Sequence, residues 1–159
     1  MYGMHLELAV VDMAGITIQK NGVVERSLRR GLERACGAVP LGFDERFRAM
    51  RGTAKYDMCL DLIGGDRVTA GQALEFFDEE VHAAVDRGEF APVSGARDAL
   101  HHLAGLGLKV RLTTGFSRSS CDHVLDALAW RTEVDLSLSS DDVGRGRPWR
   151  ISSSRQSCA

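Results

Sequence analysis

The sequence lacks a long hydrophobic run, a secretory leader pattern and a close cysteine pair, and each absence excludes a class of protein. No apolar stretch approaches the roughly 20 residues that a transmembrane helix needs, so no membrane span is expected. The N-terminal stretch MYGMHLELAVVD has no basic region and no cleavage site, which argues against a signal peptide and favours a cytoplasmic protein. The 4 cysteines share no CxxC spacing, so we expect free buried thiols rather than a zinc or dithiol redox site.

The charge of the chain offers nothing that would attract nucleic acid. The formal net charge is −2 and the basic residues are dispersed, so no nucleic-acid partner is expected. The length of 159 residues suits about one domain. With 44% hydrophobic and 26% charged residues, the chain can form a packed core.

An apolar stretch near the N-terminus stops at a single carboxylate. The residues LAVV (8–11) predict a strand that is covered on both faces, as in a parallel sheet, and Asp12 follows it directly. Parallel sheets bind ligands at the carboxyl ends of their strands, so Asp12 is expected to face a crevice. Gly15 permits a sharp turn and leaves backbone amides available to an anion. An aspartate that simply ends a strand in a turn is the alternative interpretation.

The rest of the chain alternates helical and strand-like segments. Apolar residues recur at helical spacing over 20–38 and 70–87, and another helix is expected near 60–63, so residues 20–90 are predicted to be helical. A hinge at 91–95 leads to a helix that ends near residue 106, and strands are predicted at 109–115 and 134–140 with a helix between them. This order predicts an α/β fold with a Rossmann-like parallel sheet. The core is expected to comprise residues 1–19 and 91–148, with a helical cap at 20–90 and an irregular tail at 149–159.

Polar groups follow each of the three predicted strands. Asp12 ends the first strand, Thr114 and Gly115 end the second, and GRGRP (144–148) follows the third. A carboxylate, a hydroxyl with free loop amides and a cation would together suit one phosphoryl group. The carboxylate can attack phosphorus, and the other groups can bind the oxygens as charge shifts. The three strand ends therefore predict chemistry at a phosphorus centre.

These segments resemble the haloacid dehalogenase superfamily, and within it the phosphonatase-like hydrolases. DMAGITI (12–18) is similar to the first motif of that subgroup, VRLTTGF (110–116) to the second and SSDDVGRGRP (139–148) to the third. The resemblance implies Mg²⁺-dependent hydrolysis of a phosphate ester or phosphonate through an aspartyl-phosphate. It also implies these roles: Asp12 as nucleophile, Thr114 as phosphate ligand, Arg147 as neutralising cation, Gly15 and Gly115 as substrate-binding loop positions, and Asp12 with the Ala14 backbone carbonyl as Mg²⁺ ligands.

The resemblance leaves the fate of the leaving group open. Most phosphatases of the superfamily carry an acid/base aspartate where this chain has Ala14, so the usual proton donor to an alkoxide is missing. In true phosphonatases a cap lysine forms a Schiff base with the substrate aldehyde, and RGTAKYD (51–57) resembles that segment, with Lys55 at the matching place. Met58 stands where the phosphonatase pattern has histidine. We predict that Lys55 is a solvated, substrate-binding residue and forms no Schiff base.

Two departures from the family pattern predict low activity for this chain. Ile16 replaces a motif threonine and has no hydroxyl. After GRP the family continues with a helix, a strand and an acidic motif that completes the Mg²⁺ site, whereas this sequence reads WRISSSRQSCA. We expect that tail to be disordered polar sequence or the product of a frameshift or truncation. Asp141 and Asp142 precede the third motif and are not expected to replace the missing ligands. The Asp12 strand would then lie at an unpaired sheet edge, which favours self-association.

The expected ligand is a small phosphorylated or phosphonate metabolite, and two other functions stay open. The chain could be a non-catalytic remnant that binds a phosphorylated ligand or a partner strand. It could also be a phosphoacceptor domain of response-regulator type, although the spacing of 102 positions from Asp12 to Thr114, filled by a helical block, disfavours this.

Several aromatic and imidazole side chains are given structural roles. Trp130 and Phe116 are expected to pack in the core, and His101 and His102 to lie on the surface. For His82 and His123 the sequence identifies no partner.

Overall fold

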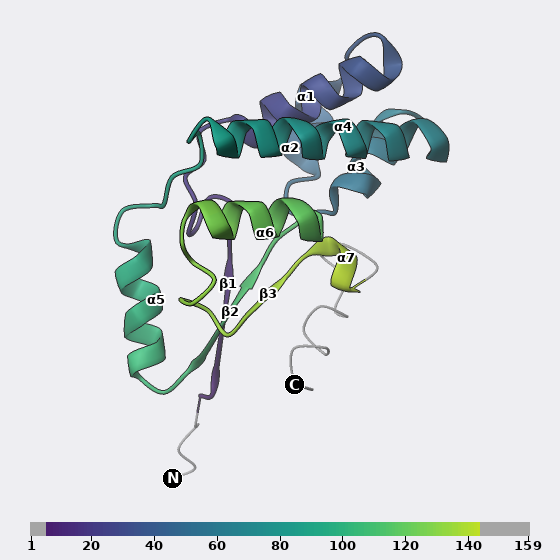
Figure 1. The fold of residues 1–159 in the computed structure, drawn as a ribbon. Coiled ribbons are helices and arrows are strands. Elements are labelled where there is room, and N and C mark those ends of the chain that lie inside the picture. The colour runs from purple at the N-terminus through teal and green to yellow at the C-terminus, as the bar shows by residue number, and fades with distance from the viewer. Residues whose placement is uncertain (1–5, 144–159) are drawn as a thin grey trace.

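Strands and helices alternate through residues 6–143, which are the residues that the computed structural model describes (Figure 1). Their order is β1 (Leu8–Asp12), α1 (Val23–Cys36), α2 (Phe43–Ala49), α3 (Lys55–Leu62), α4 (Arg67–Asp86), α5 (Ala96–Gly105), β2 (Lys109–Thr113), α6 (Arg118–Ala127), β3 (Leu136–Leu138) and α7 (Ser140–Val143). The predicted α/β class is confirmed, and helices α1–α4 fall within residues 20–90. The third strand is shorter than expected because Ser140 already begins α7. The predicted tail at 149–159 lies outside the described residues.

The described strands form one parallel sheet in the order β1-β2-β3. Asp12 is aligned with Thr113, and Thr113 with Leu138, so the three strands end at one edge of the sheet. Strand β1 was expected to be covered on both faces, and this expectation is wrong: Val10 is 46% exposed. Among the described residues β1 lies at the margin of the sheet, whereas Val110 and Leu112 in β2 are fully buried.

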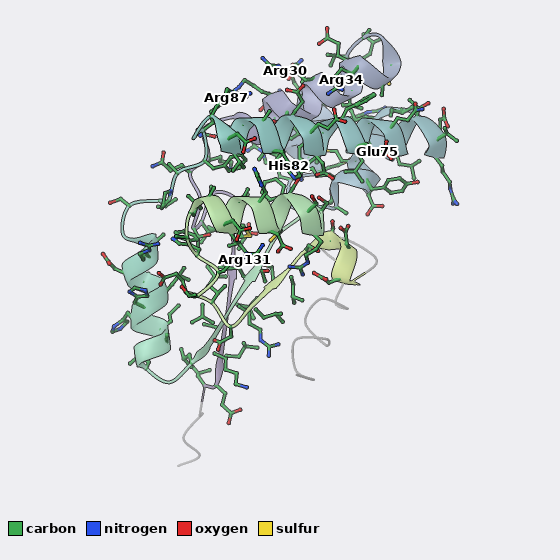
Figure 2. All side chains as sticks on the ribbon, viewed as in Figure 1. Arg30, Arg34, Glu75, His82, Arg87 and Arg131 are labelled. Carbon is green, nitrogen blue, oxygen red and sulfur yellow. The ribbon has the colours of Figure 1, made fainter. Side chains whose placement is uncertain are left out.

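Helices α1–α4 form a layer beyond the carboxyl ends of the strands, with α6 between that layer and the sheet (Figure 1). Helix α1 packs along α4 at a very short separation. A Cβ atom added at Gly31 would lie 2.8 Å from the Ala73 carbonyl oxygen and 2.8 Å from the Phe77 amide nitrogen, so glycine is required there. Ion pairs of Arg30 with Glu80 and of Arg34 with Glu79 border this contact, and Figure 2 shows both arginines on the outer layer.

A polar stripe on α4 contacts α6 and so joins the helical layer to the core. Asp78, His82 and Asp86 are spaced at i, i+4 and i+8 and therefore share one face of α4. Ser120 donates a hydrogen bond to Asp78 at 2.6 Å, and the ring of His82 lies 4.7 Å from that of His123. His82 occupies the side of α4 that faces α6 (Figure 2). The histidine pair joins segments about forty residues apart, which explains why sequence spacing could not reveal it.

We predict that Asp78→Asn stabilises the chain more at pH 7 than at pH 4. Burial raises the pKa of Asp78 despite hydrogen bonds from Ser120 and Ser117. The pKa of Asp78 in the folded chain is therefore higher than in the unfolded chain. Between these two pKa values the folded chain keeps the Asp78 carboxyl protonated while the unfolded chain releases the proton, so the free energy of unfolding falls as the pH rises through this range. Asparagine avoids the buried charge and should raise the free energy of unfolding by up to about 1 kcal/mol at pH 7. Urea unfolding at both pH values measures this, with the exposed Asp57→Asn on α3 as control. An equal effect at both pH values would contradict the prediction.

The remaining structural expectations have mixed outcomes. Trp130 and Phe116 are buried and His101 and His102 are exposed, as predicted. Cys59 and Cys121 are free and buried, and burial raises the pKa of the Cys59 thiol to about 12. Cys36 is exposed, so the expectation of buried thiols is wrong there, and Cys158 lies outside the described residues. In the described part of the chain, no helix is long and apolar enough to cross a membrane.

Candidate active site

The loop after β1 is a tight turn that holds Asp12 at the end of the strand. The Met13 carbonyl accepts hydrogen bonds from the amides of Thr17 and Ile18 at 3.1 and 2.8 Å. The buried Thr17 hydroxyl donates to the same carbonyl at 3.2 Å, which fixes the base of the turn. Gly15 has φ +86°, a conformation that favours glycine. Ile16, which stands where the family motif has threonine, is 58% exposed, so the side chain at this position lies at the surface.

The loop after β2 presents a hydroxyl beside that turn. Thr114 is buried, its amide donates to the Leu138 carbonyl at 2.9 Å, and its hydroxyl accepts a hydrogen bond from the Phe116 amide at 3.2 Å. An oxygen that accepts this bond can still donate its proton to a ligand. Phe116 is fixed in turn, because its ring stacks on Phe77 of α4 at 6.3 Å. The helical layer therefore helps to set the position of the Thr114 loop.

The loop before α3 contacts the loop after β2 at Gly115. A Cβ atom on Gly115 would lie 2.8 Å from the carbonyl oxygen of Thr53 and 3.5 Å from Nζ of Lys55. Glycine is therefore needed at position 115 to let the helical layer approach the loop after β2. Lys55 Nζ lies 3.4 Å from the Thr53 carbonyl oxygen, which places the ammonium group at this contact.

A cleft of about 940 Å³ lies where these loops meet, at the carboxyl ends of the strands. Its walls include every sequence-predicted site residue that the structure describes: Asp12, Ala14, Gly15, Lys55, Thr114 and Gly115. The volume is at the upper end of the range for small-molecule sites. Residues from positions 12 to 116 are thus brought together around one space, with a carboxylate, a hydroxyl and a buried cation in its wall.

Comparison with known proteins identifies the family. The sequence model of the haloacid dehalogenase-like hydrolases matches residues 6–152. The chain belongs to this family. A phosphonoacetaldehyde hydrolase from Bacillus cytotoxicus is 34% identical, over 92% of this chain and 60% of that protein. The resemblance to phosphonatase-like members is therefore confirmed, and the chain spans less than two thirds of that relative.

Solved structures of other proteins share the fold. A hydrolase from Pseudomonas syringae superimposes with a TM-score of 0.75 at 18% identity, over 91% of this chain and 65% of that one. A phosphonoacetaldehyde hydrolase-like protein from Oleispira antarctica gives 0.74 at 18% identity, over 94% of this chain and 59% of that one. At this level of identity the likeness supports the fold alone.

Within this haloacid dehalogenase-like site, Lys55 is more buried than the sequence led us to expect. The side chain was predicted to be solvated, and that prediction is wrong, because Lys55 is only 7% exposed. Helix α3 begins at Lys55 and turns it inwards, against the loop that Gly115 leaves open. Sequence spacing alone could not show this burial, which depends on the contact between Thr53 and Gly115.

The acidic residues before the third motif have other partners. Asp142 accepts hydrogen bonds from the Ser139 amide at 2.7 Å and from Arg118. Burial by itself would raise the pKa of Asp142, but these hydrogen bonds outweigh it and hold the pKa below its ordinary value. Asp141 accepts from the Arg118 amide at 2.7 Å. Both carboxylates are thus engaged with Arg118, and the expectation that neither serves as a replacement ligand stays a prediction.

Arg118 is a residue that the sequence did not single out. It also donates to the Ser137 carbonyl at 2.9 Å, and the Ser140 hydroxyl donates to the Phe116 carbonyl at 2.9 Å. These bonds tie the end of β3 to the loop after β2. They hold β3 and the start of α7 beside the loop after β2, and the predicted cation Arg147 lies outside the described residues.

Proposed function

We propose that the chain hydrolyses a phosphate ester or a phosphonate, with Asp12 as the nucleophile. The observation that carries the proposal is the meeting of Asp12, Thr114 and Lys55 in one cleft at the carboxyl ends of parallel strands. A carboxylate oxygen of Asp12 attacks phosphorus, and the bond to the leaving group breaks with its electron pair on that group. Water then attacks the aspartyl-phosphate, which releases phosphate and regenerates the carboxylate. The Thr114 hydroxyl donates to a phosphoryl oxygen, and Lys55 balances its charge.

Mg²⁺ is the cofactor that this cleft would hold, and the residues present are compatible with it. Within residues 6–143 no group of three His, Cys, Asp or Glu side chains is placed to hold a metal ion. The Asp12 carboxylate and the Ala14 carbonyl both belong to the cleft wall. One carboxylate and one carbonyl suffice for Mg²⁺ when water and substrate phosphoryl oxygens complete the octahedron. The ion would neutralise phosphoryl charge, and a site with so few protein ligands is expected to be weak.

A panel assay with acid-quenched mass spectrometry tests the proposed function. The chain is incubated with Mg²⁺ and a series of phosphate esters and phosphonates, and phosphate release is recorded. Peptide mapping after the acid quench should locate a phosphoryl group on the peptide that contains Asp12. A phosphoryl group on another residue, or phosphate release that survives loss of Asp12, would overturn the proposal.

A phosphonate with a carbonyl group is the second candidate substrate, and the burial of Lys55 favours it. Removal of an amine from water favours its neutral form, which can attack a carbonyl carbon. In that route the amine condenses with the carbonyl and expels water, and the electron pair of the C–P bond moves into the imine when Asp12 takes the phosphoryl group. Met58, fully buried and in the wall of the same cleft, argues against it. A thioether cannot carry the protons that imine formation needs.

We therefore predict that borohydride reduction in the presence of phosphonoacetaldehyde leaves Lys55 unmodified. In a separate binding measurement, Lys55→Arg should retain affinity for ethylphosphonate, because arginine keeps the positive charge. Lys55→Met should weaken that affinity by about tenfold. Intact-mass measurement followed by peptide mapping detects the adduct. A reduced adduct on Lys55 would contradict the prediction and establish the imine route.

A further inference from the structure

The described wall of the cleft contains more cationic than acidic residues. Three cations and two acids belong to its described wall: Lys20, Arg51, Lys55, Asp12 and Glu25. Glu25 lies 3.7 Å from Arg29 on α1, so part of its charge is already balanced. Within residues 6–143 neither Lys20 nor Arg51 forms an ion pair. A chain with a net charge of −2 therefore concentrates positive charge in this cleft.

A tight turn fixes the position of Arg51. The Met50 carbonyl accepts hydrogen bonds from the Thr53 amide at 3.1 Å and from the Thr53 hydroxyl at 2.8 Å. Arg51 and Gly52 are the two central residues of this turn, and Gly52 has φ +87°, as a type II turn requires at its third position. The guanidinium lies over the Phe47 ring, 5.8 Å from its centroid. Turn and ring together limit where the arginine can point.

The same turn connects Arg51 to the reacting end of the cleft. Thr53, two residues along, provides the carbonyl that meets Gly115, and Lys55 is four residues along. The stem of Lys20, another residue of the cleft wall, lies against the turn after Asp12: a Cβ atom added at Gly15 would be 3.7 Å from the Lys20 Cδ atom. Asp12, Thr114 and Lys55 account for one phosphoryl group. Arg51 and Lys20 are additional cations, and the volume of about 940 Å³ is far larger than one phosphoryl group occupies.

We propose that Arg51 binds a second anionic group on the substrate, separate from the phosphoryl group that Asp12 attacks. The guanidinium fork matches an anion with two equivalent oxygens, such as a carboxylate or a second phosphoryl group. Lys20 adds positive charge to the same cleft. This inference rests on the proposed function, because it takes the phosphoryl end of the cleft as given, and it narrows the substrate class to compounds with two anionic groups.

Isothermal titration calorimetry with unreactive ligands in the presence of Mg²⁺ tests the inference. Phosphonoacetate and methylenediphosphonate carry a second anionic group, and ethylphosphonate carries none. Wild type should bind at least one of the two doubly anionic ligands about tenfold more tightly than ethylphosphonate. Arg51→Gln should remove that difference and leave the affinity for ethylphosphonate unchanged. Arg48→Gln, on α2 and outside the cleft wall, is the matched control and should behave as wild type.

The possible outcomes separate this inference from the proposed function. Equal affinity of wild type for all three ligands, or an unchanged difference in Arg51→Gln, would overturn the inference while the proposed function stands. No binding of any ligand by wild type would overturn both. The ligand with the larger increase in affinity over ethylphosphonate identifies the second group: phosphonoacetate indicates a carboxylate, and methylenediphosphonate indicates a phosphoryl group. Thermal melting confirms that both variants are folded.

Discussion

Replacing Asp12 with asparagine is expected to abolish formation of the Mg²⁺–fluoroberyllate complex and to reduce any phosphate release by a factor of about 10³ or more. Fluoroberyllate mimics a phosphoryl group bonded to a carboxylate oxygen, and an amide cannot form that bond. Aspartate and asparagine side chains have nearly the same shape, and the turn after β1 is held by the Met13 carbonyl and Thr17, so the fold should persist. Fluorine NMR detects the bound complex directly.

The control for this experiment is a carboxylate far from the cleft. Asp98→Asn, exposed on α5, removes the same charge and should leave fluoroberyllate binding unchanged. An Asp12→Asn chain that still traps fluoroberyllate, or that releases phosphate at the wild-type rate, would show that the nucleophile lies elsewhere.

The 159-residue chain is also expected to self-associate and to turn over substrate slowly, well below about 1 per second. Among the described residues β1 lies at the margin of the sheet and exposes Val10, and such an edge can pair with the same edge of another copy. Slow turnover is expected because the proposed Mg²⁺ site, in which Asp12 is the side-chain ligand that we identify, would bind the ion weakly. Size-exclusion chromatography with light scattering, run beside a phosphate-release assay, measures both properties.

A single lysine should suppress the association if β1 is the surface involved. Val10→Lys places a charge on the exposed edge and is expected to shift the chain towards the monomer. Leu41→Lys is the matched control, because Leu41 is 95% exposed but lies in the loop before α2. A chain that is monomeric without substitution, or that both variants affect equally, would contradict this assignment of the surface.

The sequence predicted the framework of the fold because its signals are local. Runs of apolar residues before Asp12 and before Thr114 mark strands, and helical spacing marks α1 and α4, so the α/β class and the helices at 20–90 followed from pattern alone. The placement of Asp12 and Thr114 at one edge of the sheet also followed, since parallel strands end at one edge, and Asp12 aligns with Thr113, the residue directly before Thr114. The sequence could not predict that β1 leaves Val10 exposed, because an apolar run indicates a strand but not its place in the sheet.

By itself the sequence determined the family, and it supplied the candidates for the nucleophile and for the phosphate-binding loop, since each depends on residue types at fixed spacing along the chain. Only the tertiary structure decided that Lys55 is buried, that Arg51 lines the cleft and that His82 contacts His123. Burial of Lys55 follows from the approach of Thr53 to Gly115, two residues separated along the chain by α3, α4, α5 and β2. The histidine pair requires α4 to lie against α6. Contacts between distant segments depend on how whole helices pack, and no short stretch of sequence encodes that packing.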